Sequence, residues 1–472
     1  MLDPIINFLN DIFWNYVLVY GLLAVGVFFT IRLGFLQIVH FPEMFKAVTG
    51  SRSGDRAGIS PFQALCTSLA SRVGTGNLAG VAVALPLGGP GAIFWMWIVA
   101  LLGMATAYAE STLAQLYKTR NENGEYRGGP AFYIAHGLNA PWAGAVFSVC
   151  LIRAFGLVFN AVQANSIADA MEGAFGAPKL WVGIALAAVT AIVIFGGIRQ
   201  IARVAEITVP FMAVAYLLVA LFVIIVNIGE VPAMLGLIVQ SAFGLDAAAG
   251  GLMAALLNGV KRGLFSNEAG MGSAPNIAAV ATPDPHHPSS QGFVQSLGVF
   301  IDTILICTAT ALMILLSGVL STGTELTGTP LTQAAMSVHI GGAGQYFIAI
   351  AILFFAFTSI IGNYSYAENA MVFLRIGNLP GLVVLRLGVL GMVVWGAYES
   401  VATVFNAADA SMGLMATVNL IAIVLLSGTV VKLTRDYTAQ RKAGQEPLFH
   451  ADDYPELGGK IDTSIWNRRD PG

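Results

Sequence analysis

Charged residues are scarce in this sequence of 472 residues, where Asp, Glu, Lys and Arg together make up 10%. A soluble domain usually has roughly 25% of them, so this chain cannot cover a globular surface with charge. Hydrophobic residues make up 56%, and the mean hydropathy is +0.75. Apolar runs such as 205–227 and 298–320 reach the roughly 20 residues that cross a bilayer as a helix. Because lipid offers no partners to backbone polar groups, these runs predict an all-α integral membrane protein.

Other absences exclude further classes of protein. The formal net charge is −3, without the concentrated basic face that nucleic-acid binding needs. The three cysteines stand singly within apolar runs, which argues against a disulfide framework. We find no HExxH or GxSxG motif, and we expect no enzyme. The N-terminus has no basic region or small-residue cleavage site, so we expect it to be retained.

Apolar windows predict about eleven transmembrane helices. The first six are expected near 14–36, 61–86, 91–117, 141–170, 180–197 and 205–228. The other five are expected near 247–282, 291–319, 344–375, 381–397 and 407–432.

These helices divide the chain into four regions. Residues 1–60 hold an extra N-terminal helix and an interfacial segment, while 61–228 and 247–432 are two series of five helices. Residues 433–472 form a polar tail without an apolar run, for which we expect no core.

Positive charge gathers in alternate connections between the expected helices. These connections contain Lys46, Arg52, Arg56, Lys118, Arg120, Arg127, Arg199, Arg203, Arg375 and the basic tail from Lys432. The opposite connections show only Lys179. Since Lys and Arg are retained on the cytoplasmic side, we expect a protein of the cell membrane with its N-terminus outside and its tail in the cytoplasm.

The helices expected at 61–86 and 247–282 start from opposite sides of the membrane, and glycines interrupt both. Each opens one series of five helices, which predicts an inverted repeat of five plus five. Paired interruptions at corresponding positions of two inverted halves point to the binding site of a transporter.

The first interruption is Gly74-Thr75-Gly76-Asn77. Two glycines permit the chain to leave helical geometry, and Asn77 can cap the helix that restarts. The N–H groups freed there carry partial positive charge and suit a substrate carboxylate near Thr75 and Gly76. The carbonyl groups freed before the break, at 70–73, are hard ligands that suit an alkali cation.

Two other interpretations of these glycines remain. Small residues also let transmembrane helices pack closely, which alone could explain Gly74 and Gly76. The pattern in 74–79 also fits a dinucleotide fingerprint, but that motif needs a preceding strand, and an apolar helix precedes it here.

The second interruption, within 264–275, mixes polar residues, two glycines and a proline in one apolar run. Its freed carbonyl groups could accept hydrogen bonds from a substrate ammonium. Phe265 and Met271 could form apolar walls that limit the size of the substrate, although most aromatic side chains in a bundle serve packing.

Ionisable residues within the apolar runs are functional candidates because burial makes them costly. They are Arg72, Glu110, Arg153, Glu206, Lys261, Arg262, Glu268, Asp302 and Glu368. Structural ion pairs can explain most of them, and Arg72, Glu110 and Glu268 lie nearest the breaks. The amide of Gln163 needs a buried partner, from substrate or protein, whereas the hydroxyls of Thr358 and Ser359 could simply bond to their own helix.

Two stretches resemble the alanine or glycine:cation symporters, also called sodium:alanine symporters. They are 88–97 (GGPGAIFWMW) with 103–110 (GMATAYAE), and 267–275 (NEAGMGSAP). The resemblance covers most of the chain, from Pro61 to Lys432. It implies the inverted five-plus-five fold of the amino acid-polyamine-organocation superfamily.

The resemblance also implies roles for individual residues, with sodium as the coupling ion. The substrate site would use Thr75, Gly76, Asn77, Gln163, Phe265, Ser266, Asn267, Gly270 and Met271. The sodium site would use the carbonyls of Ala70 and Val73 and the hydroxyls of Thr358 and Ser359. The implied activity is sodium-coupled import of alanine, in either enantiomer, or glycine.

Two alternatives stay open at this point. The chain could be a proton-coupled permease, with Glu268 or Glu110 carrying the proton, or a membrane receptor that senses an amino acid. The expected partners are a small amino acid, sodium and membrane lipid, without nucleic acid. The sequence leaves the oligomeric state, the number of sodium ions and the preferred amino acid open.

Overall fold

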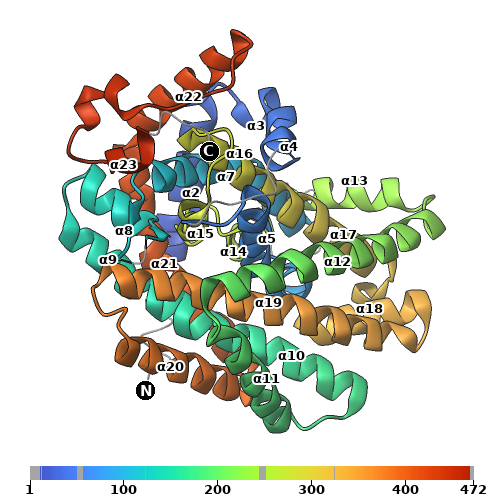
Figure 1. Ribbon diagram of the computed structural model, residues 1–472. Helices are drawn as coiled ribbons and strands as arrows, with labels where there is room; N and C mark the ends of the chain where they lie inside the picture. The colour runs from blue at the N-terminus through green and yellow to red at the C-terminus, as the bar shows by residue number, and fades with distance from the viewer. Residues whose placement is uncertain are drawn as a thin grey trace.

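The computed structural model describes residues 11, 13–49, 57–122, 124–243, 251–323 and 325–467, which form one bundle of helices (Figure 1). Among these residues, the regular strands are a single short antiparallel pair, β1 (Thr119–Arg120) and β2 (Tyr126–Arg127). The predicted all-α class is therefore confirmed.

Seven helical stretches among the described residues are long and apolar enough to cross a membrane. They are α7 (Gly91–Leu116), α9 to α10 (Pro141–Phe175), α12 (Gly197–Val226), α16 to α17 (Pro288–Leu316), α19 (Ala343–Phe373), α20 (Leu379–Tyr398) and α21 (Val401–Leu425). Shorter apolar helices are α2 (Val19–Arg32), η2 to α6 (Gly76–Gly88), α11 (Lys179–Ile194) and α13 (Val231–Ala242). Each expected transmembrane run thus contains helix in the structure, counting the broken helices of the two interrupted runs.

The structure also has helices that the apolar windows left out. Helix α13 lies in the expected connection between the two halves, and α18 (Gly328–Ile340) precedes α19. Helix α13 packs on α7, where the indole of Trp95 donates to the Ala242 carbonyl over 3.3 Å. Such short helices gain their stability from tertiary contacts, so a search for apolar runs of membrane length does not find them.

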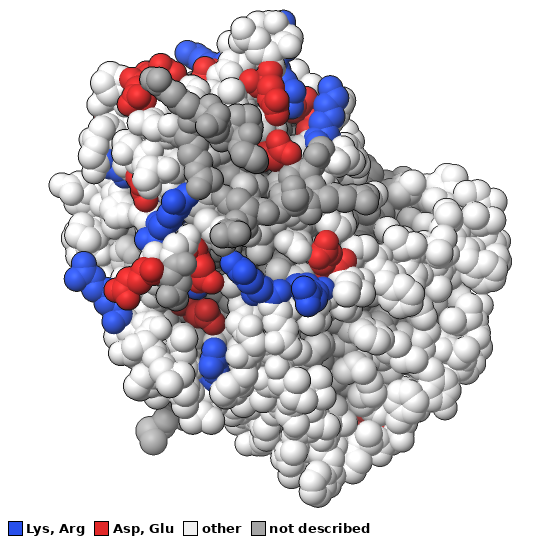
Figure 2. Space-filling model, in the orientation of Figure 1, with Lys and Arg blue, Asp and Glu red and all other residues white. Residues whose placement is uncertain are grey.

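The outer surface of the bundle is apolar over a wide area. Figure 2 shows charged side chains over the upper, left and middle parts of this face, and almost none over α13 and α18. On α11, α12 and α20, Ile192, Phe211 and Val384 expose 70–71% of their surface. Apolar side chains exposed in such numbers suit contact with lipid and not with water.

The first predicted break is present between α5 (Pro61–Arg72) and the π-helical segment η2 (Gly76–Gly80), which continues into α6 (Val81–Gly88). Helix α5 begins with a capping box, because the Ser60 hydroxyl accepts from the Gln63 N–H and the Gln63 side chain accepts from the Ser60 N–H. It ends where Val73 takes a ψ of 85°, outside the helical range.

The second predicted break is present between α14 (Gly251–Asn267) and α15 (Pro275–Val280). Glu268, Gly270 and Gly272 have positive φ angles of 57°, 93° and 81°. Glycine reaches this region without strain, which explains both glycines, whereas Glu268 reaches it at a cost. Helices α5, α14 and α15 lie together near the centre of the bundle (Figure 1), so both breaks occupy one region.

The expectation that the tail has no core is wrong. Helix α22 (Ser427–Lys442) is followed by the short helices η7 (Ala451–Asp453), η8 (Pro455–Leu457) and α23 (Thr463–Trp466). Phe449 and Trp466 are fully buried, and the Trp466 indole donates to the Leu116 carbonyl at the end of α7 over 3.1 Å. The apolar residues of the tail are too sparse to form a run, but they pack on the ends of other helices.

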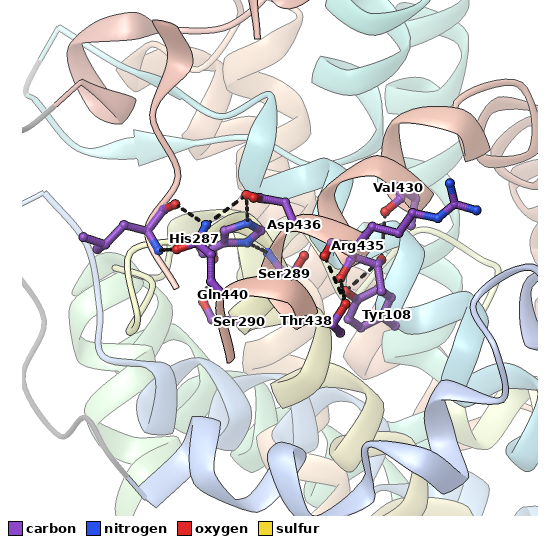
Figure 3. Close-up of polar contacts among 11 residues, drawn as sticks. Tyr108, His287, Ser289, Ser290, Val430, Arg435, Asp436, Thr438 and Gln440 are labelled. Atoms are coloured by element: carbon purple, nitrogen blue, oxygen red, sulfur yellow. Dashed lines mark hydrogen bonds and ion pairs between the residues drawn. The ribbon is translucent and has the colours of Figure 1, made fainter. Parts of the chain in front are cut away.

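A histidine joins the tail to the start of α16 (Pro288–Val299), as Figure 3 shows. His287 Nδ1 accepts from the Ser289 N–H over 3.1 Å, and Nε2 lies 3.2 Å from Asp436 Oδ2 on α22. This arrangement suits a neutral ring whose Nε2–H donates to Asp436, because a second proton on Nδ1 would break the bond that caps α16. Nearby, the Tyr108 hydroxyl of α7 lies 3.0 Å from that of Thr434 on α22.

Acidification should loosen the tail. Burial lowers the pKa of His287 below its ordinary value of 6.5, and Asp436 opposes this only in part. The folded pKa lies below the unfolded one, so this contribution to stability is complete above about pH 6.5 and declines as the pH falls. We expect faster hydrogen exchange in residues 436–467 at pH 5.5 than at pH 7.5, after correction for the intrinsic pH dependence of exchange.

The matching variant is Asp436→Asn, which should speed exchange in the same residues at pH 7.5. Asp453→Asn, at an exposed carboxylate of the tail, is the control. Equal protection of the tail at both pH values would contradict this account of His287.

Candidate substrate and cation site

The first break is held by α10 (Phe159–Phe175). The side-chain oxygen of Gln163 accepts from both the N–H of Thr75, over 3.0 Å, and its hydroxyl, over 2.6 Å. All three groups are buried. The structure thus joins two of the predicted substrate residues, and it shows where the N–H freed by the break finds a partner.

Both glycines of this break lie where a side chain would collide with neighbours. A Cβ atom on Gly74 would lie 2.2 Å from the Ser359 hydroxyl and 2.8 Å from the Gln163 oxygen. One on Gly76 would lie 3.1 Å from the Phe265 ring and the Ser266 Cα. The interpretation that these glycines allow close packing is therefore correct. The neighbours that pack against them are themselves predicted site residues.

The predicted sodium ligands come from α5 and α19. The Ala70 carbonyl, in the last turn of α5, accepts from the Ser359 hydroxyl over 2.9 Å. Ser359 also lies 3.0 Å from the Phe355 carbonyl in its own helix, and Thr358 donates to the same carbonyl over 2.9 Å. Ala70, Val73, Thr358 and Ser359 are buried. Carbonyl and hydroxyl oxygens are the donor types that an alkali cation takes, so this set fits sodium by its chemistry.

A buried carboxylate links the two breaks. The side-chain amide of Asn77 donates to Asp302 Oδ1 over 2.5 Å, and the Ser266 hydroxyl donates to Oδ2 over 2.8 Å. Thr303 donates to the same Oδ2 over 2.6 Å. Asn77 and Asp302 both belong to π-helical segments, η2 and η5 (Phe300–Cys307), which often mark functional sites.

Asp302 stood among the ionisable candidates of the sequence but was not selected as a site residue. The available signal was that it is the sole acid in the apolar run 291–319. Asp302 is far from both breaks along the chain, so the sequence alone did not indicate its contacts with them.

Aromatic rings close one side of the region. Phe265 stacks on Phe159 at 4.9 Å between ring centroids, and Phe405 lies tilted against it at 5.5 Å. A Cβ atom on Gly76 would lie 3.1 Å from this ring, so Phe265 lies beside the first break, where its ring can limit the room for a substrate side chain.

The remaining predicted substrate residues have their hydrogen bonds elsewhere. The Gly270 N–H donates to Glu110 Oε2 over 3.2 Å, and its carbonyl accepts from Asn419 over 3.0 Å. The Asn267 oxygen accepts from the nearby Ala269 N–H, and the Met271 N–H donates to the Glu268 carbonyl. These contacts join the second break to α7 and α21 and do not bring Asn267, Gly270 or Met271 to Thr75.

Neutral donors surround the other acids near the breaks. Glu268 accepts from Ser71 over 3.0 Å and from Ser273 over 2.5 Å, while Arg72 donates to the carbonyl and side chain of Gln295. Within the described part of the chain, neither Glu110, Glu268 nor Asp302 has a Lys, Arg or His nitrogen within 4.0 Å. Arg72 therefore shares a region with three buried carboxyl groups without a direct ion pair.

A family model described as the sodium:alanine symporter family matches residues 1–451 of this sequence. The chain belongs to that family. Membership confirms the resemblance, and together with the apolar helices it makes the protein a multi-pass membrane transporter and not an enzyme.

Relatives in the family are named for different substrates and coupling ions. The chain is 50% identical to the probable sodium/glutamine symporter GlnT of Bacillus subtilis, over 96% of this chain and 94% of that protein. It is 42% identical to the sodium/alanine symporter AgcS of Methanococcus maripaludis, over 93% and 98%. It is 41% identical to a sodium/proton-dependent alanine carrier protein of Bacillus sp. (strain PS3), over 87% and 95%.

Gly74→Ala should abolish amino-acid uptake in this family member, because the added Cβ displaces Ser359 and Gln163 together. Gly21→Ala, in a helix where nothing lies within 4 Å of the added carbon, is the matched control and should keep full activity. Uptake into proteoliposomes measures the effect, with size-exclusion elution to show that both variants fold. Normal uptake by a folded Gly74→Ala protein would show that the close contacts are not needed.

Proposed function

We propose that the chain is a sodium-coupled symporter that imports a small neutral amino acid, alanine or glycine, by alternating access around the two breaks. The pair of bonds from Thr75 to the Gln163 oxygen carries this proposal. One N–H and one hydroxyl converge there on a single oxygen, and such a pair of donors suits a carboxylate oxygen. A substrate carboxylate takes these donors from Gln163 when it binds.

Sodium occupies the adjoining oxygens of Ala70, Val73, Thr358 and Ser359. The Ser359 hydroxyl now donates to the Ala70 carbonyl, so a cation at this place takes over both oxygens and bridges α5 to α19. Since a ligand shifts a conformational equilibrium only through its different affinity for the two states, sodium favours the state in which α5 and α19 lie close together.

The aromatic residues beside the first break limit the size of the substrate. Phe265 packs against Phe159 and Phe405, and its ring lies beside the break at Gly76. A ring so confined leaves little room for a long side chain, which favours alanine and glycine. The alanine names of two relatives support this choice, whereas the name of GlnT supports glutamine.

The proposed architecture is an inverted pair of five-helix halves, 61–228 and 247–432, with the N-terminus outside. On this arrangement the packed tail lies in the cytoplasm and covers the inner ends of α7 and α16. Lys and Arg in alternate connections support the orientation.

The decisive experiment is uptake into proteoliposomes with a panel of amino acids, with sodium present or replaced by choline at fixed pH. We expect alanine and glycine to accumulate against their gradients only with sodium, and glutamine to compete weakly. Accumulation without sodium would refute the coupling ion, and sodium-dependent binding without accumulation would favour a receptor.

Thr358→Ala should raise the sodium concentration for half-maximal uptake by about tenfold, the loss of about 1.4 kcal/mol of binding free energy. Thr358→Ser keeps the hydroxyl and should stay within about twofold, since a factor of two is under 0.5 kcal/mol. An unchanged sodium dependence in Thr358→Ala would remove this residue from the sodium site.

Asn77→Ala should reduce uptake of alanine strongly while the protein still folds, because Asn77 holds the break to Asp302 and caps the Gly74 N–H over 3.0 Å. The measurement is initial uptake at saturating sodium in proteoliposomes matched for protein content. Wild-type uptake by this variant would show that the link between the breaks is dispensable.

A proton-coupled permease is the second candidate, supported by the buried carboxyl groups of Glu110 and Glu268 and by the sodium/proton name of one relative. Uptake driven by a pH gradient without sodium, and lost in Glu268→Gln, would establish it. Lack of uptake under that gradient leaves sodium as the coupling ion.

A further inference from the structure

An apolar cavity of about 490 Å³ lies between α10, α11 and α19, which run side by side in Figure 1. Ile167 and Met171 of α10, Ala185 and Leu186 of α11, and Phe354 and Phe357 of α19 are among its walls. Every lining residue is apolar, and the volume is far larger than a single water molecule needs. The cavity is separate from the breaks and offers no polar partner to water.

The cavity opens on the outer surface of the bundle. Its floor is buried, with Ile167 fully covered and Leu186 6% exposed, whereas Phe175, Val189 and Phe354 at the rim are 55%, 50% and 41% exposed. Since this face of α11 belongs to the apolar surface of a membrane protein, hydrocarbon is the solvent at the opening. An acyl chain can enter without losing contact with apolar surroundings, while an empty cavity would lose dispersion contacts.

Charged groups stand at one end of the cavity. Lys179, which begins α11, lies in the sequence between the lining residues Ala177 and Val182. Its ammonium bonds to the Asp169 carboxylate and lies 3.4 Å from Glu172 Oε2. The Glu172 side chain is 55% exposed. Two of the three N–H groups of the ammonium face these carboxylates, which leaves one for a phosphate. The excess of negative charge favours an amine beside Glu172.

We propose that this cavity binds one acyl chain of a phospholipid that has a zwitterionic, amine-bearing headgroup. The chain fills the space between the three helices, the phosphate meets Lys179, and the amine meets Glu172. On the proposed orientation the lipid comes from the outer leaflet.

The site lies directly behind residues proposed to bind substrate and sodium. Ile167 is one helical turn beyond Gln163 on α10, and Phe357 adjoins Thr358 on α19. An acyl chain between these helices therefore affects how closely α19 approaches the first break. This consequence rests on the proposed function, and it predicts that lipid occupancy sets the sodium dependence of uptake.

The test uses phosphatidylethanolamine with a photoreactive diazirine in its acyl chain, added to the purified full chain in nanodiscs. Light should attach the probe to peptides of α10 and α19 that line the cavity. Ala185→Trp fills the cavity and should reduce this labelling at least tenfold. Ala188→Trp, three residues along the same exposed face of α11, is the matched control and should label like the wild type.

Labelling that avoids α10 and α19, or that persists in Ala185→Trp, would overturn the site. Equal labelling by a phosphatidylglycerol probe would overturn the headgroup assignment, and Lys179→Gln should weaken phosphatidylethanolamine labelling if that assignment holds. Ala185→Trp should also change the half-saturating sodium concentration at least threefold, and an unchanged value would overturn the link to transport. If the wild-type protein shows no sodium-dependent uptake, the proposed function is refuted. The labelling result still decides the lipid site in that case.

Discussion

Backbone groups within a membrane must find partners inside the protein, and this constraint governs the region of the two breaks. Where α5 ends, the Gly74 N–H finds the Asn77 side chain and the Thr75 N–H finds Gln163. The partners come from the same turn and from α10, so the break imposes polar residues on helices that would otherwise be apolar. In the proposed function, a ligand takes the place of these partners when it binds.

Charge follows the same logic. Glu110, Glu268 and Asp302 are buried near Arg72, and each carboxyl group accepts hydrogen bonds from neutral donors. Burial of a carboxylate costs free energy even when neutral groups donate hydrogen bonds to it, so a cation that binds in this region is favoured. Coupling of transport to a cation is thus consistent with the composition of the core, and Asp302 ties that charge to both breaks.

The length of the apolar runs and the positions of the glycines within them were sufficient to predict much of the fold. Two glycines and an asparagine within an apolar run predicted the first break, and the mixed polar segment around Glu268 predicted the second. Helix α13 was not predicted because it is shorter than a membrane crossing. The packing of the tail was not predicted because Phe449 and Trp466 are isolated in the sequence. Their burial depends on surfaces that other helices supply.

The sequence by itself determined that the chain is an all-α membrane protein with two interrupted helices, because apolar length and glycine content act locally. Only the tertiary structure decided that Gln163 meets Thr75, that Asp302 joins Asn77 to Ser266, and that the tail seals against α7. These contacts link residues far apart along the chain. Their formation depends on how whole helices pack, which no local pattern of residues records.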